Sequence, residues 1–376
     1  MKRCNAVLID AKEGFKKDVI RAEGEPLPET ADLTSWFLRD FPNLTSGRNS
    51  KQMPEITMLE AIRQAIFEEM ERDPAVVIIG EDIGVFGGAF KVTAGLLQRF
   101  GPERVIDTPI SEIAIVGAAC GMSYLNLRPI VELEFIDFIA CCFNQITNFV
   151  AKSHYRWGAP VPLVIRGPAG GGVRGGPFHS ANPEMYFVHT PGIKVIYPST
   201  PFDAKGLLKS AIRDNNPVLF LEHKLLYRRF KEEVPTDDYT IPLGEAVVRR
   251  EGRHLTIATY GAMTHASLEA AAKLQNDGIS AEVVDLRCLQ PLDMKTIVES
   301  VERTNKLLVV HEDTRTGGIA GEIAARVFEG AFDSLDGPVV RVTARDTPVP
   351  FSPPLEDYFL PNAEDIANAA RRLARY

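Results

Sequence analysis

Residues 76–80 read Val76-Val77-Ile78-Ile79-Gly80, a short unbroken apolar run. A run of this length and composition is typical of a strand in a parallel sheet that is buried on both faces. The segment before it predicts a helix, because Thr57 and Glu60 form a capping box and apolar residues then recur on one helical face from 58 to 70. A helix that leads into a doubly buried strand indicates an α/β fold.

The alternation of helix and strand continues along the chain. In the first half, we predict helices at about 112–125, 138–155 and 201–213, and strands at 129–135, 161–166 and 218–222. In the second half, we predict strands near 255–260, 281–286, 306–311 and 339–344, and helices near 263–276, 293–303, 318–328 and 363–375. The charged run at 223–244 between them is a candidate linker. The pattern predicts two three-layer α/β domains with mostly parallel sheets, at 54–230 and 231–376, after an N-terminal extension at 1–53.

Composition excludes several classes of partner. The 376 residues carry a net charge of −8, which disfavours nucleic acid or an anionic membrane surface as the main partner. The sequence has no apolar run of about 18 residues, the length that spans a membrane. Its acid-rich N-terminus lacks the apolar core of a signal peptide, so we expect a cytoplasmic protein. Its five cysteines form neither a Cys-x-x-Cys pair nor a cluster with zinc spacing.

Glu112 is a candidate for acid–base chemistry. It opens a helix of otherwise apolar and small residues within the stretch 107–119. Because a helix that is apolar on all sides is expected to be buried, the acid should lie beside an apolar space, where desolvation favours the protonated form of a carboxylate. The alternative is structural, since an acid that follows a Ser111 N-cap stabilises the helix dipole.

A glycine-rich loop at 167–178 leads to a second candidate, His179. It contains Gly170-x-Gly172-x-x-Gly175, the spacing of a dinucleotide-binding turn, but Pro177 interrupts the helix that should follow. We interpret the loop as one that packs closely against a ligand or another subunit. His179 would then lie where α/β ligand sites form and where an imidazole can transfer a proton; the alternative is an ordinary hydrogen-bonded histidine.

Two more segments have both a structural and a functional interpretation. Glu134, Phe135 and Phe138 lie where the strand at 129–135 turns into a helix, and the rings form either part of the core or a wall for a flat heterocycle. The loop at 214–217 reads Asp-Asn-Asn-Pro, which suits either a simple turn or a hard cation held by carbonyls and a carboxylate.

These motifs together resemble the β subunit of the E1 component of 2-oxo acid dehydrogenase complexes. Members of this family, of the pyruvate, branched-chain 2-oxo acid and acetoin types, are thiamine-diphosphate enzymes of the transketolase superfamily. The resemblance runs from about residue 54 to the end. It is carried by Glu81-Asp82-Ile83-Gly84, Asp107-Thr108-Pro109-Ile110-Ser111-Glu112, Leu127-Arg128-Pro129-Ile130, Phe178-His179-Ser180, Pro191-Gly192-Ile193-Lys194-Val195 and the stretch 203–217. It implies a pyrimidine-binding transketolase-like domain at 54–230 and a transketolase C-terminal-like domain at 231–376.

The resemblance implies a role for each candidate. Glu112 matches the acid that hydrogen-bonds the aminopyrimidine of the cofactor and so activates it. Phe138 matches the aromatic residue that packs on this ring, and Glu134 lies in the same pocket. His179 matches a histidine that transfers protons while the acyl group passes to a lipoyl arm. A potassium ion is implied at Ala211, Asp214, Asn216, Val161, Leu163 and Val164.

The resemblance also implies partners. The sequence lacks the Gly-Asp-Gly motif that holds the diphosphate through Mg²⁺; the nearest match is Asn276-Asp277-Gly278, in the second domain. An α subunit would supply that half of the site in an α₂β₂ heterotetramer, and a lipoyl-bearing E2 component would accept the acyl group. Two residues depart from the family pattern, since Ala181 stands where glutamine is common and Glu134 where Met or Gln is common.

Alternatives remain at this point. The chain is either a catalytic E1β subunit acting on a 2-oxo acid, a self-sufficient transketolase-like enzyme, or a non-catalytic scaffold or regulatory paralogue. An NAD-binding oxidoreductase built on the glycines at 170–175 is a further possibility. The 2-oxo acid itself is open, with a lean toward branched-chain substrates from the residues at 179–184.

Overall fold

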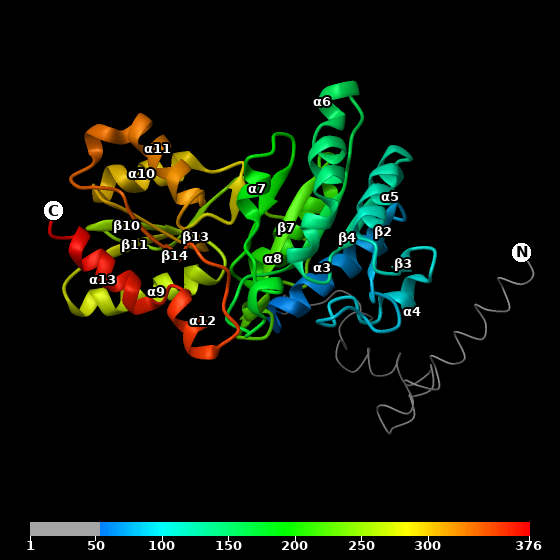
Figure 1. The fold of residues 1–376 in the computed structure, drawn as a ribbon, viewed down its shortest axis with the longest axis horizontal. Helices are drawn as coiled ribbons and strands as arrows, with labels where there is room; N and C mark the ends of the chain where they lie inside the picture. Colours follow the sequence, from blue (N-terminus) through cyan, green and yellow to red (C-terminus); the bar gives the residue numbers. More distant parts are fainter. Residues whose placement is uncertain (1–52) are drawn as a thin grey trace, which may run out of the picture. The chain divides into compact units, whose positions relative to one another are not determined.

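The computed structural model describes residues 53–376, so the predicted N-terminal extension at 1–53 lies, apart from Met53, outside the described part. The described residues form a seven-stranded sheet, a five-stranded sheet and a two-stranded ribbon. Figure 1 shows most of the first sheet in the blue-to-green part of the chain and the second in the yellow-green-to-red part. Helices cover both sheets, which confirms the predicted α/β class.

The seven-stranded sheet has the strand order β12-β6-β7-β5-β4-β2-β3. Its strands are β2 (Val76–Glu81), β3 (Val105–Thr108), β4 (Arg128–Glu132), β5 (Val164–Ala169), β6 (Lys194–Ile196), β7 (Val218–His223) and β12 (Cys288–Gln290). All neighbours pair in parallel except β12, which is antiparallel to β6. Every residue of β2 is buried, as its unbroken apolar run predicts.

Helices pack on both faces of this sheet. They are α3 (Met58–Arg72), α4 (Leu96–Phe100), α5 (Glu112–Tyr124), α6 (Ser153–Trp157), α7 (Glu184–Val188) and α8 (Pro201–Arg213). Ile78 of β2 belongs to the core cluster that contains residues of α3 and α8, whereas Ile79 belongs to the cluster that contains residues of α5. Alternate residues of one strand therefore face opposite layers. The predicted capping box at Thr57 is present at the start of α3.

The helix predicted at 138–155 is irregular. It consists of a 3-10 segment η1 (Ile136–Cys142), a π segment η2 (Gln145–Val150) and the short α6. The hydroxyls of Thr147 and Ser153 donate to the carbonyls four residues earlier, at 2.9 and 2.6 Å. Such bonds compete with the backbone ladder and bend helices. The apolar pattern predicted the helical path of the chain but not these departures from α geometry.

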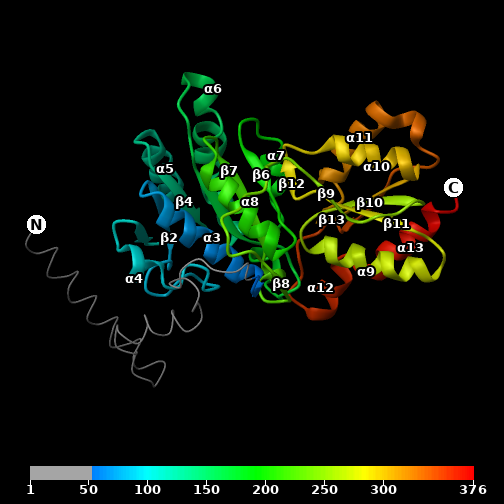
Figure 2. The ribbon, with the colours of Figure 1, turned by 180° about the vertical axis from the view of Figure 1, so that it is seen from behind.

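The five-stranded sheet has the order β14-β13-β10-β11-β9. Its strands are β9 (Val247–Arg250), β10 (Leu255–Thr259), β11 (Ala281–Asp285), β13 (Leu307–Thr314) and β14 (Val340–Ala344). Its helices are α9 (Ala262–Asn276), α10 (Met294–Thr304), α11 (Ile319–Ala331), α12 (Pro353–Phe359) and α13 (Ala363–Leu373), with a 3-10 turn η5 (Phe332–Ser334). Figure 2 shows α9 and α13 on one side of the sheet and α10 and α11 on the other. Only the edge strand β9 runs antiparallel, so the predicted mostly parallel sheet is confirmed.

The predicted linker at 223–244 packs against the first domain. After the turn η4 (Lys224–Leu226), β8 (Lys231–Glu233) pairs with β1 (Glu55–Thr57) at the start of the described chain. Further on, the ring of Tyr239 stacks on Phe202 of α8 with centroids 4.8 Å apart. In addition β12, which follows β11 in the sequence, lies beside β6 and extends the first sheet (Figure 2). The connections between the two sheets are thus ordered by contacts with the first.

Candidate active site

The candidate site lies at the carboxyl edge of the first sheet. Strands β2 to β5 are parallel neighbours there, so the residues that follow them meet at one edge. Glu81 ends β2, Glu134 and Phe135 follow β4, and the loop that begins at Gly170 follows β5. Ligand sites of open α/β sheets form at this edge, where helix N-termini and strand ends converge.

Glu112 is the first residue of α5 and is half-buried. The loop before it is held by Glu81, whose Oε1 accepts a hydrogen bond from the N–H of Ser111 at 3.0 Å. Burial raises the pKa of the Glu81 carboxyl, and the nearby carboxylates of Glu112 and Glu134 raise it further against the effect of that bond. Ser111 stands at the predicted N-cap position, but its hydroxyl donates to the carbonyl of Pro109 at 2.8 Å rather than capping the helix.

The prediction that α5 is buried on all sides is wrong for the single chain. Ile115 and Val116 lie in the core, but Ile113 is 55% exposed, and the small residues Gly117 and Ala118 are also exposed. Leu125, just after the helix, is 76% exposed. An apolar surface of this kind is the usual mark of an interface with another chain. The burial that the composition of α5 predicts would be reached only if a second polypeptide covered this exposed face.

The second predicted group is brought together in the structure. The His179 ring meets Phe135 edge-on with centroids 4.4 Å apart and meets Phe138 at 5.8 Å. Burial raises the pKa of the nearby Glu134 carboxyl, as does Asp82, while the charge of His179 opposes both. Because Phe138 lies in η1, which packs against α5, the aromatic group borders the helix that carries Glu112.

The glycine-rich loop binds carboxylates of the same chain. The N–H of Gly171 donates to Glu312 at 2.6 Å, and the N–H of Gly172 donates to Glu356 at 2.9 Å. A dinucleotide-binding turn would use such backbone groups for a diphosphate. Since they are already bonded to buried acids, the dinucleotide interpretation of the spacing at 170–175 is not supported.

A buried charge network beneath the site escaped the sequence interpretation. The Arg166 guanidinium lies between Glu132 and Glu222, and its Nε donates to Glu222 at 2.5 Å. Tyr227 donates to the same carboxylate at 2.6 Å. Burial raises the pKa of Glu132 to about 7, although Arg166 opposes this effect. The available signal was a charged residue within each apolar strand run, because such residues are almost always paired when buried.

A lysine side chain of the same chain lies at the predicted potassium site. The Asp214 carboxylate contacts Lys194 Nζ at 2.5 Å and accepts from the N–H of Asn216 at 2.8 Å. Burial alone would raise the pKa of Asp214, but these two partners lower it below its ordinary value. Val161 approaches the same turn, with its N–H 3.1 Å from the carbonyl of Asn215, and the carbonyl of Ala211 accepts from Asp214. Leu163 directly precedes β5 and Val164 is its first residue, and the carbonyl of Leu163 accepts from the N–H of Val218, just after this turn.

Lys194 therefore already balances the Asp214 carboxylate, so a second cation here would depend largely on carbonyl oxygens. Among residues 53–376, no group of three or more His, Cys, Asp or Glu side chains is arranged to hold a metal ion. The described helices also include none with the length and apolarity needed to cross a membrane.

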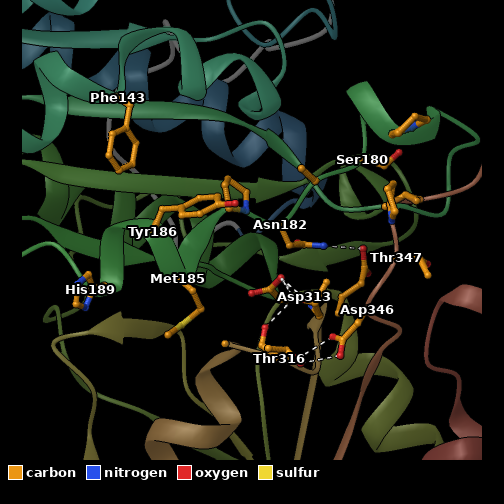
Figure 3. A pocket seen from close by; sticks show the side chains of 18 of the residues that line it. Phe143, Ser180, Asn182, Met185, Tyr186, His189, Asp313, Thr316, Asp346 and Thr347 are labelled. Atoms are coloured by element: carbon orange, nitrogen blue, oxygen red, sulfur yellow. Dashed lines mark hydrogen bonds between the residues drawn. The ribbon is translucent and has the colours of Figure 1, made fainter.

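A cavity of about 1020 Å³ lies next to the loop that follows His179. Figure 3 shows Asn182 and Tyr186 from the first domain, with Asp313, Thr316 and Asp346 from the second, around this space. The Thr316 hydroxyl donates to Asp346 at 2.7 Å along one wall. The lining of the cavity includes Ser180 but not the candidate residues at 112, 138 and 179, so the cavity is separate from the candidate site.

Comparisons with known proteins agree with this architecture. Residues 54–229 match the transketolase pyrimidine-binding domain family, and residues 244–366 match the transketolase C-terminal domain family. A split-gene transketolase, described as an inactive β4 tetramer, superposes with a TM-score of 0.69 at 25% identity, covering 86% of this chain and 99% of that one.

Curated relatives are more similar still. The 2-oxoisovalerate dehydrogenase subunit beta and the pyruvate dehydrogenase E1 component subunit beta of Bacillus subtilis are each 48% identical, over 86% of this chain and 100% of their own. The acetoin:2,6-dichlorophenolindophenol oxidoreductase subunit beta of Cupriavidus necator is 50% identical, over 83% of this chain and 95% of its own. With its two transketolase-type domains, the chain belongs to the family of E1 β subunits of 2-oxo acid dehydrogenase complexes.

Proposed function

We propose that this chain, joined to an α subunit, catalyses the oxidative decarboxylation of a 2-oxo acid with thiamine diphosphate and passes the acyl group to the lipoyl arm of an E2 component. The observation that carries the proposal is the grouping of His179, Phe135 and Phe138 at the sheet edge beside the helix opened by Glu112. Bound thiamine diphosphate supplies a nucleophilic carbon and an electron sink for decarboxylation.

Glu112 is the proposed hydrogen-bonding partner of the aminopyrimidine ring. The chemistry of the site suits such a ring, since a half-buried carboxylate at a helix start lies near an aromatic wall that includes Phe138. A carboxylate there can exchange a proton with a ring nitrogen, and an aromatic side chain gives a flat heterocycle a packing surface. Glu134, which like Glu112 lies near Glu81, is the proposed second acid beside this ring.

His179 is the proposed proton-transfer group for the acyl-transfer step. Acyl transfer reduces the lipoyl disulfide, so one sulfur forms the thioester and the other takes up a proton as a thiol. The His179 ring is half-buried and is placed by its contacts with the rings of Phe135 and Phe138. An imidazole suits the role because its ordinary pKa lies near neutrality.

The α subunit is the proposed partner of the exposed face of α5. The sequence has no Gly-Asp-Gly motif for Mg²⁺ and diphosphate, so that half of the site must come from another chain. The apolar face formed by Ile113, Ala114, Gly117 and Ala118 offers a contact surface at the helix that Glu112 opens. We propose an α₂β₂ heterotetramer in which Mg²⁺ is held mainly by α, and a K⁺ ion near Asp214 and Asn216 of β.

The proposed substrate is a 2-oxo acid, without a choice among its chemical subclasses. Relatives named for pyruvate, 2-oxoisovalerate and acetoin are 48 to 50% identical to this chain, so similarity does not separate them. A panel of 2-oxo acids tested on the assembled α–β pair would make that choice.

The deciding experiment compares Glu112→Gln with Glu322→Gln in the assembled complex. Glu322 is an exposed acid in the first turn of α11, so it reproduces the helix-dipole effect away from the candidate site. We expect Glu112→Gln to abolish thiamine-dependent release of CO₂ from the 2-oxo acid and Glu322→Gln to leave it unchanged. Equal activity of the two variants would make Glu112 structural and contradict its proposed role. Full activity of the chain without α would favour a self-sufficient enzyme.

A further inference from the structure

The loop between β5 and His179 is rich in glycine and contains several residues with positive φ. Gly170 and Gly172 have φ values of 80° and 82°, and Arg174 has a φ of 64°, all in the left-handed region. Glycine adopts this region without strain but loses much conformational entropy when it is ordered. A loop of this kind needs strong external contacts to hold one conformation.

Glu312 provides the first of these contacts. It lies near the end of β13 in the second domain and is almost fully buried. Its Oε1 accepts from the N–H of Gly171 at 2.6 Å and from the side-chain amide of Asn182 at 3.1 Å. Its Oε2 lies 2.7 Å from His223 Nε2. The carboxylate therefore joins the loop to two later residues of the first domain, Asn182 and His223.

Glu356 provides the second contact and is completely buried. Its Oε1 accepts from the N–H of Gly172 at 2.9 Å. Its Oε2 accepts from the N–H of Arg174 at 3.2 Å and from the guanidinium of the same residue at 2.8 Å. Hydrogen bonds to ionised acceptors are stronger than neutral ones, and leaving buried donors without partners is costly.

The far end of the loop also lies against the second domain. A side chain at Gly176 would collide with the ring of Phe351 from that domain. Gly176 then accepts at its carbonyl from the N–H of His179 at 3.3 Å. On the other side of His179, the Asp137 carboxylate accepts from the N–H groups of Ser180 and Ala181, at 3.1 and 2.9 Å.

His179 thus lies between two sets of anchors. One is Asp137 of η1, the segment that also carries Phe138; the other is the pair of acids from the second domain. We propose that Glu312 and Glu356 are positioning residues, which fix the place of His179 against the aromatic wall by binding the backbone of its loop. The loop contacts are independent of the enzyme's chemistry, whereas the consequence for acyl transfer rests on the proposed function.

The test uses the assembled α–β complex with Glu356→Gln and a matched control, Asp357→Asn. Asp357 is the next residue of α12 and also pairs with Arg174, but it is 65% exposed and contacts the side chain rather than the loop backbone. Hydrogen–deuterium exchange of the peptide that covers 170–180 should become faster in Glu356→Gln and stay unchanged in Asp357→Asn. Unchanged exchange in Glu356→Gln would overturn the proposed anchoring.

Two half-reactions then separate positioning from general damage. We expect Glu356→Gln to slow acyl transfer to a lipoyl domain by about 10- to 100-fold, because small displacements of a reacting group have effects of this size. Decarboxylation followed with an artificial electron acceptor should stay close to that of the original complex. When Glu356→Gln is combined with His179→Ala, acyl transfer should be no slower than with His179→Ala alone, since both changes act on one step.

Equal losses in both half-reactions, or additive losses in the double variant, would make Glu356 merely structural. If Glu356→Gln does not assemble, Glu312→Gln provides the same comparison through Gly171. Faster exchange in a complex that shows no thiamine-dependent activity even without substitution would retain the anchoring but reject the proposed function.

Discussion

His223 Nε2, at the end of β7 in the first domain, lies 2.7 Å from Glu312 Oε2, near the end of β13 in the second. Both side chains are buried. Burial alone would raise the pKa of Glu312, but the charge and hydrogen bond of His223, together with the donors from Gly171 and Asn182, lower it to about 2. The two domains are therefore joined by a carboxylate that is more stable in its ionised form.

This lowered pKa predicts how stability depends on pH. A carboxylate with a depressed folded-state pKa stabilises the fold above its unfolded value and loses that contribution as the pH falls. The original protein should therefore lose thermal stability relative to Glu312→Gln as the pH falls from about 4.5 toward about 2. Unfolding midpoints by calorimetry measure this difference. The exposed Glu103→Gln serves as a control, and a difference independent of pH would contradict the prediction.

The exposed face of α5 predicts a selective loss of assembly. Ala118→Arg places a charged side chain on this face, where an exposed substitution changes the stability of the single chain by only about 0.5 kcal/mol. We expect the variant to keep its thermal midpoint but to fail to form the α–β complex in sedimentation velocity. Ala325→Arg makes the same change on an exposed position of α11 and should assemble normally. Normal assembly of Ala118→Arg would exclude this face as the contact with α.

Potassium dependence tests the turn near Asp214. If K⁺ binds the folded complex, its thermal midpoint should be higher in KCl than in LiCl at equal ionic strength, because a ligand that binds only the native state stabilises it. A K⁺ concentration of 100 times its dissociation constant would add about 2.7 kcal/mol. Asp214→Asn should reduce the difference between the two salts. The same midpoint in both salts before any substitution would remove the metal from the proposal.

Local sequence patterns predicted the helices and strands whose own residues indicate how they are buried. The strand at 76–80 was predictable because an unbroken apolar run needs burial on both faces, and α3 because its capping box and apolar stripe are local features. β12 was not predictable, since it is three residues long and gains its strand geometry by pairing with β6, far away in the sequence. Tertiary contacts, rather than local preference, determine such short strands.

The spatial grouping of the candidate residues was predictable only in part. The positions at 134, 138 and 179 follow strand ends or turns, so a parallel sheet brings them to one edge. The acids that anchor the glycine-rich loop were not predictable, because Glu312 and Glu356 contact it from more than 140 residues away. The exposed side of α5 was mispredicted for a different reason: the composition of a helix does not distinguish burial within its own chain from a surface that is apolar but exposed.

The antiparallel pairing of β12 with β6 has a consequence for synthesis of the protein. During translation, the β6 side of the first sheet lacks its edge strand until the ribosome has made β12, which follows β11 of the second sheet. Until then the β6 edge presents free backbone groups, which are a template for pairing with other chains. A truncated protein that ends after β8 would therefore keep the β6 edge of its sheet unpaired and would be prone to self-association, however well its core packs.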